Sequence, residues 1–200
     1  METLLFTTMV VIAYLMGSVL FSIVLAKIFN ANDPRSGGSK NTGATNMLRV
    51  NSLYLAILTL LFDMLKGLLP VAIAIYWGFD QFYASLIGLA AIIGHIFPVF
   101  YKFSGGKGVA SAIGVIFAIN YVTAILLLLV WLAVFPWTKL SSLSALIGFF
   151  VATIFAFYSV DVGASITQLI ITLIIFLTHK QNIIALYSGK EEKSVIFNKK

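Results

Sequence analysis

The polar stretch at residues 37–49 combines residue types that suit the binding of a phosphate-like anion. It reads Gly-Gly-Ser-Lys-Asn-Thr-Gly-Ala-Thr-Asn-Met-Leu-Arg and contains no carboxylate. Its glycines let backbone N–H groups approach an anion closely and form a positively polarised nest. Hydroxyl and amide side chains add neutral donors, and Arg49 adds a planar guanidinium that matches phosphate oxygens. An ordinary polar loop between membrane spans is the alternative interpretation. The candidate ligands are Ser39, Asn41, Thr45, Asn46 and Arg49.

A second glycine-rich stretch, Ser-Gly-Gly-Lys-Gly at 104–108, leads directly into a predicted helix. The free N–H groups and partial positive charge of a helix N-terminus bind anions. It is not a Walker nucleotide loop, because that motif needs a Gly where Tyr101 stands and a Ser or Thr where Gly108 stands. We therefore expect an anion site here, with a flexible turn carrying a lysine as the alternative. Its candidate residues are Gly105, Gly106, Lys107 and Gly108.

His179 and Asn182 follow the last apolar run and are spaced i,i+3, so they share one face of a helix. An imidazole can accept a hydroxyl proton near neutral pH, and an amide can orient a substrate or stabilise an oxyanion. These two residues are candidates for catalysis, together with Lys107 and Arg49. Polar residues that merely mark the end of a membrane span are the alternative interpretation.

Three further ionisable residues lie within apolar stretches. Asp63 and Lys66 are spaced i,i+3, so each can offset the charge of the other. An ion at the middle of a span costs about 2.5–3.5 kcal/mol on insertion scales, so neither residue should face lipid. We expect a structural ion pair, with a supporting role beneath an active site as the alternative. A lone His95 near the end of its run is expected to be buried and hydrogen-bonded.

Several kinds of chemistry have no residues to carry them. The sequence contains no cysteine, no cluster of Asp, Glu and His at metal-ligand spacing, and no Gly-x-Ser-x-Gly nucleophile motif. We therefore expect no metal ion and no cofactor. The chemistry that remains would depend on positioning and positive charge.

The composition is that of a polytopic membrane protein. Of 200 residues, 60% are hydrophobic and 10% are charged, whereas soluble domains carry about 25% charged residues. The mean hydropathy is +1.04. The net charge of +6 suits anionic lipid headgroups and anionic small molecules. We expect no nucleic-acid partner, because the sequence has no soluble basic domain.

Apolar runs predict an all-α integral membrane protein with seven transmembrane helices in one domain, since a span needs roughly 20 apolar residues. The loops that hold Lys and Arg fall on one side, and Glu2, Asp80 and Asp161 fall on the other. Cytoplasmic loops concentrate Lys and Arg, so the N-terminus is expected outside and the C-terminus in the cytoplasm. If the short fourth run did not cross, Lys139 would break this asymmetry. The predicted spans are 4–28, 53–77, 82–101, 106–119, 121–137, 143–158 and 162–178, followed by a basic tail at 190–200.

Four motifs in this order resemble those of the PlsY-type acyl-phosphate:glycerol-3-phosphate acyltransferases. The resemblance covers the chain from the first loop to the end of the last helix. The motifs are Gly38-Ser39-x-Asn41-x-Gly43-Ala44-Thr45-Asn46-x-x-Arg49, Asp63-x-x-Lys66-Gly67-x-x-Pro70, Gly94-His95-x-x-Pro98-Val99-Phe100 followed by Gly105-Gly106-Lys107-Gly108-Val109-Ala110, and His179-x-x-Asn182.

This resemblance implies a bacterial inner-membrane enzyme of phospholipid synthesis whose active site faces the cytoplasm. It would transfer a fatty acyl group from acyl phosphate to the 1-hydroxyl of glycerol 3-phosphate, which gives lysophosphatidic acid and inorganic phosphate. Ser111 stands where the family commonly has Thr. The positions that match family phosphate-binding and active-site residues are Ser39, Asn41, Arg49, Lys107, His179, Asn182 and, in the loop before the sixth helix, Ser142.

An acyl phosphate already carries an activated carbonyl and a good leaving group, so we expect direct attack by the hydroxyl without an enzyme-bound intermediate. Either His179 or a substrate phosphate oxygen would take the proton, and the acyl chain would lie in a groove between helices. A phosphate or organophosphate transporter is the main alternative, and a membrane scaffold is a weaker one. The sequence leaves open which loop holds which phosphate, the acyl-chain preference and the oligomeric state.

Overall fold

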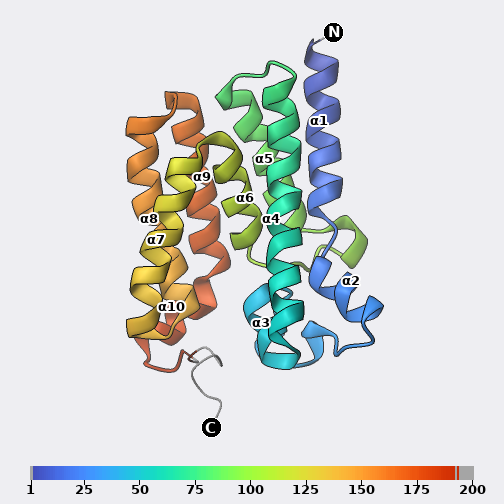
Figure 1. Ribbon diagram of the computed structural model, residues 1–200, viewed down its shortest axis with the longest axis vertical. Coiled ribbons are helices and arrows are strands. Elements are labelled where there is room, and N and C mark those ends of the chain that lie inside the picture. The colour runs from blue at the N-terminus through green and yellow to red at the C-terminus, as the bar shows by residue number, and fades with distance from the viewer. Residues whose placement is uncertain (1, 192, 194–200) are drawn as a thin grey trace.

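A computed structural model describes residues 2–191 and 193, and this part of the chain is helical with no β-strand. Helices alternate with short loops from one end of the described chain to the other (Figure 1). The α-helices are α1 (Glu2–Gly17), α2 (Phe21–Ile28), α3 (Ala44–Val50), α4 (Leu53–Tyr76), α5 (Gln81–Ile96), α6 (Val109–Ile119), α7 (Tyr121–Thr138), α8 (Ser141–Ser159), α9 (Val162–Thr178) and α10 (Lys180–Tyr187); two 3₁₀ helices are η1 (Pro34–Ser36) and η2 (Val99–Tyr101).

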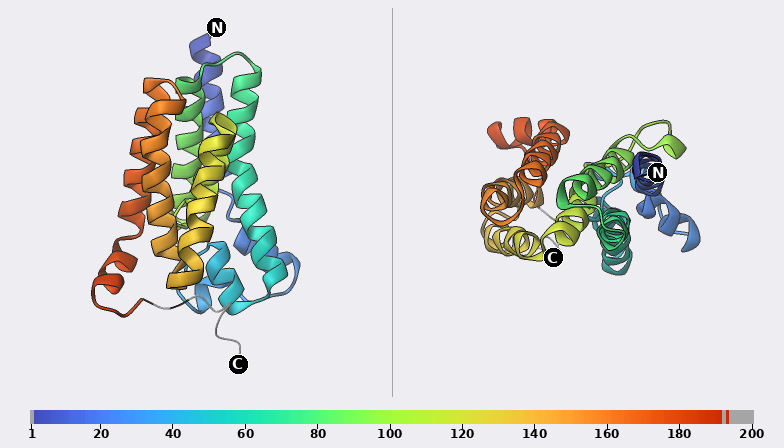
Figure 2. Two further views of the ribbon diagram at one scale, coloured as in Figure 1. Left: turned by 60° about the vertical axis from the view of Figure 1, so that its left-hand side comes forward. Right: turned by 90° about the horizontal axis from the view of Figure 1, so that it is seen from above.

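The long helices stand side by side in two groups. Helices α1, α4 and α5 form one group and α7, α8 and α9 form the other, while α6 lies between them (Figures 1 and 2). Helix α6 contacts α4, α5, α7 and α9, so it joins the two groups. The short helices α2, α3 and α10 lie toward the end of the molecule opposite the start of α1. The fully buried core includes Ile87, Ala91, Ile92, Phe149, Ile171 and Ile175.

Three helices of the described chain begin at the same end with a side-chain cap. Asp80, Asn120 and Asp161 each accept a hydrogen bond from the backbone N–H three residues further on, at 2.9, 3.0 and 2.8 Å. These caps satisfy N–H groups that a helix start leaves without a partner. The Asn120 side chain also donates to the Ser159 carbonyl at 3.1 Å, and the Gln81 side chain accepts from the Asp161 N–H at 3.3 Å. The ends of α5, α6, α8 and α9 therefore meet in one layer.

Glycines allow α4 and α6 to pack backbone against backbone. A Cβ atom on Gly114 would lie 2.0 Å from the Met64 carbonyl oxygen, and one on Gly67 would lie 2.1 Å from the Ser111 carbonyl oxygen. Both distances are far shorter than a van der Waals contact, so only glycine fits. Small residues at helix contacts let backbones approach closely in membrane proteins. This packing sets the distance between the helix that carries Asp63 and the helix that follows Lys107.

One of the predicted spans is interrupted. The run at 4–28 is divided into α1 and α2, which are bent by 47°. The predicted span at 162–178 coincides with α9, and the 60° bend toward α10 follows it at His179. Four helices are long and apolar enough to cross a membrane, or up to six if each bent pair is one span, within the described residues. Helix α6, with 11 residues, is a shorter apolar helix.

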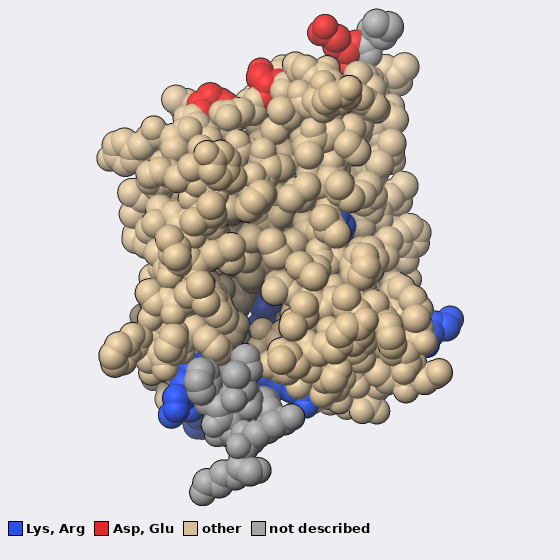
Figure 3. Space-filling view, in the orientation of Figure 1, with Lys and Arg blue, Asp and Glu red and all other residues tan. Residues whose placement is uncertain are grey.

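Charged side chains are divided between the two ends of the molecule. The Asp and Glu side chains visible in Figure 3 lie near the end where α1 begins, and most of the visible Lys and Arg side chains lie toward the opposite end. A hollow opens on this basic half of the surface, and blue atoms are visible inside it. The tail predicted at 190–200 is described only at Lys190, Glu191 and Lys193, and its other residues lie outside the described chain.

Candidate active site

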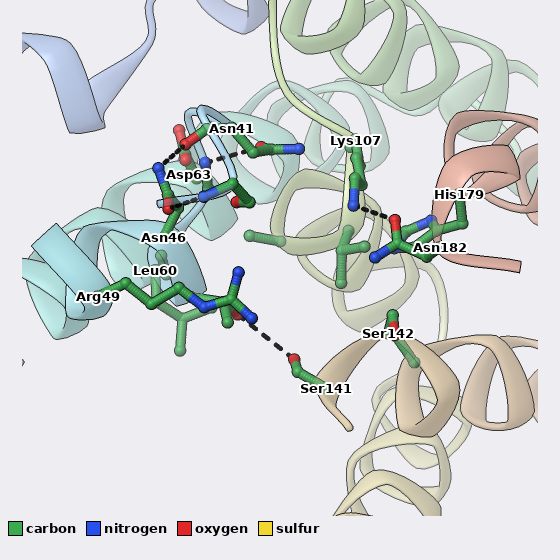
Figure 4. Close-up of a pocket in the computed structure, with 18 of the residues that line it drawn as sticks. Asn41, Asn46, Arg49, Leu60, Asp63, Lys107, Ser141, Ser142, His179 and Asn182 are labelled. Atoms are coloured by element: carbon green, nitrogen blue, oxygen red, sulfur yellow. Dashed lines mark hydrogen bonds between the residues drawn. The ribbon is translucent and has the colours of Figure 1, made fainter. Parts of the chain in front are cut away.

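A cavity of about 150 Å³ lies where four separate segments meet, and α4, α5 and Glu191 also contribute to its lining. The segments are α3 with the loop before it, the loop that enters α6, the start of α8, and the junction of α9 with α10 (Figure 4). Of the residues expected to form a site, all line this cavity except Gly105 and Gly106. The polar residues that line it are Ser39, Asn41, Thr45, Asn46, Arg49, Asp63, His95, Lys107, Ser141, Ser142, His179, Asn182 and Glu191.

Asn46 holds the loop before α3 in shape. Its amide nitrogen donates to the carbonyls of Pro34, Gly37 and Asn41 at 2.7, 3.2 and 2.9 Å. Its amide oxygen accepts from the Ser39 N–H at 2.8 Å. An amide nitrogen has only two N–H groups, so both are already in use. Asn46 lines the cavity, and its hydrogen bonds make it a buried support for the loop.

Arg49 and Thr45 extend from α3 toward the facing wall. Arg49 lies in the last turn of α3 and lines the cavity. The Thr45 and Ser141 hydroxyls lie 3.4 Å apart, which connects α3 to the first turn of α8 (Figure 4). Two walls from distant parts of the sequence therefore meet at this contact. Ser141 was not among the expected residues, although it directly precedes Ser142.

Lys107 is held between two helices of the opposite wall. Its ammonium group donates to the Asn182 side-chain oxygen, and its carbonyl accepts from the Thr178 hydroxyl at 3.0 Å. Burial lowers the pKa of Lys107; the Glu191 carboxylate opposes this shift, and the nearby Arg49 cation adds to it. Thr178 thus fastens the glycine-rich loop to α9. The sequence did not indicate Thr178 as part of the site, because no motif relates it to Lys107, 71 positions away.

Gly105 and Gly106 pack against His95 and support the loop from behind. The Gly106 N–H donates to the His95 carbonyl at 3.1 Å. A Cβ atom on Gly106 would lie 2.1 Å from His95 Nε2, and one on Gly105 would lie 2.0 Å from the His95 carbonyl oxygen. These glycines were expected to face a phosphate. The structure instead uses their missing side chains to bring the loop onto a buried histidine.

His179 occupies the bend between α9 and α10 and is 3% exposed. Its Nδ1 lies 2.7 Å from the Ile175 carbonyl oxygen. Because a carbonyl can only accept, we assign the proton to Nδ1, which leaves the lone pair on Nε2. Burial and the charge of Lys107 lower the pKa of His179 to about 4. The imidazole is therefore neutral at physiological pH.

Glu191 brings a carboxylate into the cavity. Its Oε1 accepts from the Ser142 hydroxyl at 2.8 Å and from the Asn182 amide at 2.6 Å. The sequence predicted residue 191 in a basic tail, and the structure brings its carboxylate against Ser142 and Asn182. The sequence signal for this turn is Gly189, because a glycine often ends a helix in the left-handed conformation. Gly189 has a φ of +66°, and the Lys190 N–H donates to the Ala185 carbonyl at 2.8 Å, so the chain turns back after α10.

Asp63 and Lys66 form the ion pair that their spacing predicted. The Lys66 ammonium lies 2.8 Å from Asp63 Oδ1, and each side chain is 2% exposed. Among the described residues, no group of three or more His, Cys, Asp or Glu is placed to hold a metal ion.

An apolar groove of about 630 Å³ lies beside the cavity, between α8 and the α9–α10 pair. It begins one residue after Ser142 on α8 and contacts α10 one residue after Asn182, so it starts next to the polar cavity. The groove is lined by Leu143, Leu146, Ile147, Phe150, Phe176, Ile183, Leu186 and Tyr187.

The fold and cavity define an integral membrane protein with a cationic pocket between its helices. Comparison with known proteins places it more narrowly. The family model of glycerol-3-phosphate acyltransferase matches residues 7–189. The chain belongs to the glycerol-3-phosphate acyltransferase family, which confirms the resemblance seen in the four motifs and makes the chain an acyltransferase of the PlsY type.

Relatives in two species of Francisella support the same assignment. The glycerol-3-phosphate acyltransferases of Francisella tularensis subsp. mediasiatica and Francisella philomiragia are 41% and 43% identical to this chain over 186 residues. Each alignment covers 93% of this chain and 91% of the relative. These relatives are bacterial, and the family is one of acyltransferases and not of transporters.

Two crystal structures of PlsY, an integral membrane glycerol 3-phosphate acyltransferase, share the fold. The glycerol 3-phosphate form has a TM-score of 0.90 at 37% identity, and the alignment covers 96% of this chain and 98% of that one. The lysophosphatidic acid form has a TM-score of 0.87 at 36% identity, with 94% of each chain covered.

Proposed function

We propose that this protein transfers a fatty acyl group from acyl phosphate to the 1-hydroxyl of glycerol 3-phosphate. The products are lysophosphatidic acid and inorganic phosphate. The observation that carries the proposal is the cavity in which Arg49 and Lys107, from opposite walls, lie beside His179 and Asn182. The names of the relatives and of the two PlsY structures support the acceptor and the product.

The two cations would hold the two phosphate-bearing substrates near each other. Arg49 lines one wall and offers a planar fork, while Lys107 lines the other as a point charge. The first turn of α6 also borders the cavity through Gly108, Val109 and Ala110, and a helix N-terminus attracts anions. Ser39, Asn41, Thr45 and Ser142 would add neutral contacts.

In the reaction, the 1-hydroxyl oxygen forms a bond to the carbonyl carbon of acyl phosphate, and the bond from that carbon to the phosphate oxygen breaks. The electron pair of the broken bond leaves with the phosphate. Positioning and electrostatic stabilisation are the means by which these residues would accelerate the step. Lys107, held by Asn182, is placed to stabilise the negative charge that develops.

We assign the hydroxyl proton to an oxygen of the departing phosphate. A phosphate oxygen has a pKa of about 6, whereas the pKa of His179 is lowered to about 4 by burial and by Lys107. His179 is therefore the weaker base of the two. Its neutral Nε2 would orient the glycerol hydroxyl through a hydrogen bond.

The apolar groove beside the cavity would hold the acyl chain. It starts next to Ser142 and Asn182, which line the polar cavity, and its eight lining side chains are aliphatic or aromatic. A chain bound there would keep its carbonyl at the cavity while its tail lies against α8. Burial of methylene groups would stabilise the complex by about 0.8 kcal/mol for each CH₂.

We further propose that the chain crosses the membrane seven times, with the cavity facing the cytoplasm of a bacterial inner membrane. In this topology α1 and α2 together form the first span, α6 is the fourth and α9 is the seventh. The ends of α5, α6, α8 and α9 meet at the acidic end, which supports a crossing by α6. Since cytoplasmic loops concentrate Lys and Arg, the basic end with the cavity would lie inside.

Purified protein in lipid vesicles tests the function directly. Given palmitoyl phosphate and labelled glycerol 3-phosphate, it should form labelled lysophosphatidic acid, and palmitoyl-CoA should not replace the phosphate donor. Lys107→Ala should lower kcat/KM by about 100- to 1000-fold, as expected for loss of a group that stabilises the transition state. Lys102→Ala is the matched control, because Lys102 is exposed and does not line the cavity.

The transfer assay can contradict the proposal in three ways. Transfer from palmitoyl-CoA alone would contradict the proposed donor, and no transfer from either donor would contradict the function. Equal kcat/KM for Lys107→Ala and Lys102→Ala would remove Lys107 from the site.

A further inference from the structure

The buried charge cluster of Asp63, Lys66 and His95 has no part in the reaction proposed above. The Asp63–Lys66 pair is 2.8 Å long, and His95 Nδ1 lies 3.8 Å from the same carboxylate oxygen. Each of the three residues is at most 3% exposed. A buried ion pair is weak evidence for stability, because well-packed apolar residues often replace it without loss. The cluster therefore calls for a role beyond holding the helices together.

Lys66 links the cluster to the break between α1 and α2. Its ammonium group donates to the Val19 carbonyl at 2.7 Å, and Val19 lies in the link where these helices bend by 47°. The same link contacts the segment after α5, because the Ser18 hydroxyl accepts from the Val99 N–H at 3.3 Å. Lys66 thus joins the Asp63 carboxylate to the backbone of this link.

His95 links the cluster to the loop that carries Lys107. His95 is buried as expected, but its Nδ1 has no hydrogen-bond partner among the described residues; it packs 3.8 Å from the Asp63 carboxylate, which is too long for a hydrogen bond. The carbonyl of the same residue accepts from the Gly106 N–H at 3.1 Å. Gly106 lies so close to the ring that a Cβ atom there would be 2.1 Å from Nε2. A shift of the ring would move Gly106, and Lys107 is the next residue. Asp63 and His95 both border the cavity from its inner side.

We propose that Asp63 is a positioning residue for Lys107: paired with Lys66, it holds His95 in place, and His95 supports the glycine-rich loop. This inference rests on the proposed function of Lys107. Asp63 would act through His95 and not on the reacting atoms, because its carboxylate is already paired with Lys66. A misplacement of about 1 Å can cost about 100-fold in rate, so a small movement of the loop is enough to matter.

The first test is a double-mutant cycle on kcat/KM for glycerol 3-phosphate. Asp63→Asn alone should lower it by about 10- to 100-fold. In the Lys107→Ala background the same change should have little further effect, because the residue that it positions is already absent. A purely structural role would lower activity by the same factor in both backgrounds, and that result would overturn the proposal.

A second variant distinguishes loss of positioning from loss of folding. Asp63→Leu with Lys66→Met replaces the pair with apolar side chains and leaves no charge unpaired. We expect this variant to fold with a lowered thermal unfolding midpoint, because the Val19 carbonyl loses its bond to Lys66, and with kcat/KM as low as in Asp63→Asn. Normal kcat/KM in this folded variant would overturn the proposal. Thr153→Val is the matched control, since it removes a buried 2.7 Å contact with Thr172 away from the cavity, and it should leave kcat/KM unchanged.

A binding measurement tests the role of Asp63 independently of the proposed acyl transfer. Calorimetric titration with glycerol 3-phosphate should show weaker binding to Asp63→Asn than to the wild type, and no further weakening when Asp63→Asn is added to Lys107→Ala. Wild-type protein that binds but does not transfer would contradict the proposed function and leave this comparison valid. Equal binding by the wild type and Asp63→Asn would overturn the inference.

Discussion

Arg49 and Lys107 are the Lys and Arg side chains that line the cavity in the described part of the chain, and they differ in chemistry. Arg49 presents a rigid planar fork, while Lys107 is a point charge whose pKa burial lowers. The proton that Lys107 carries is therefore held less tightly than usual. Its contacts to Asn182 and Thr178 fix where that charge lies.

His179→Gln tests the choice of proton acceptor. Because the pKa of His179 is lowered to about 4, its imidazole keeps the same neutral charge from about pH 5.5 upward. The pH profile of kcat/KM between pH 5.5 and 9 should therefore keep its shape in His179→Gln, with a moderate fall in height of about tenfold for a lost orienting contact. Steady-state rates across this range check the prediction. A fall above about 1000-fold together with loss of the acidic limb would make His179 the base.

At the scale of elements, the short helix α6 explains how the cavity lies below the surface. Its 11 residues rise about 16 Å, which is roughly half of a 30 Å hydrocarbon layer. Its last residue is close to the acidic end, because the Ile119 carbonyl accepts from the Gln81 side chain at 3.5 Å. Its first turn must then begin well inside the molecule. The glycine-rich loop supplies the remaining length and carries Lys107 to that depth.

Gly114→Ala tests the close packing of α4 and α6. The added methyl group would lie 2.0 Å from the Met64 carbonyl oxygen, so the helices must separate. We expect a loss of about 1–3 kcal/mol in unfolding free energy and lower activity, because α4 and α6 set the positions of Asp63 and Lys107. Gly148→Ala is the control, since its nearest contact is 3.1 Å from the Leu127 carbonyl oxygen. Thermal unfolding in detergent measures both, and equal midpoints would contradict the packing argument.

At the scale of the whole molecule, the two ends carry opposite charge (Figure 3). The acidic end holds helix caps such as Asp80 and Asp161, which serve local hydrogen bonds. The basic half holds the cavity. An anionic substrate approaching from that side would meet an attractive field, which raises its local concentration and its association rate.

The absence of cysteine makes the proposed topology easy to test by labelling. Trp77→Cys, Lys102→Cys and Lys139→Cys place single thiols in three different loops. If α6 crosses, a membrane-impermeant maleimide on intact cells should label position 77 alone, and permeabilised cells should label all three. Labelling of position 139 in intact cells would mean that α6 does not cross. The unmodified protein, which has no thiol, is the background control.

The sequence by itself determined the membrane class, the Asp63–Lys66 pair and the family motifs. Each of these depends on information that is read along the chain: the length of apolar runs, the i,i+3 spacing on a helix, and the order of short motifs. It also named most of the residues that line the cavity, because glycines, hydroxyls and cations between apolar runs stand out by composition.

Only the tertiary structure decided what each of these residues touches. Lys66 bonds to Val19, 47 positions away in the sequence, and Gly106 packs so closely on the ring of His95 that a side chain would not fit. Glu191 enters the cavity because two distant donors, Ser142 and Asn182, meet there. Burial and hydrogen-bond partners come from other segments of the chain, so no local pattern encodes them.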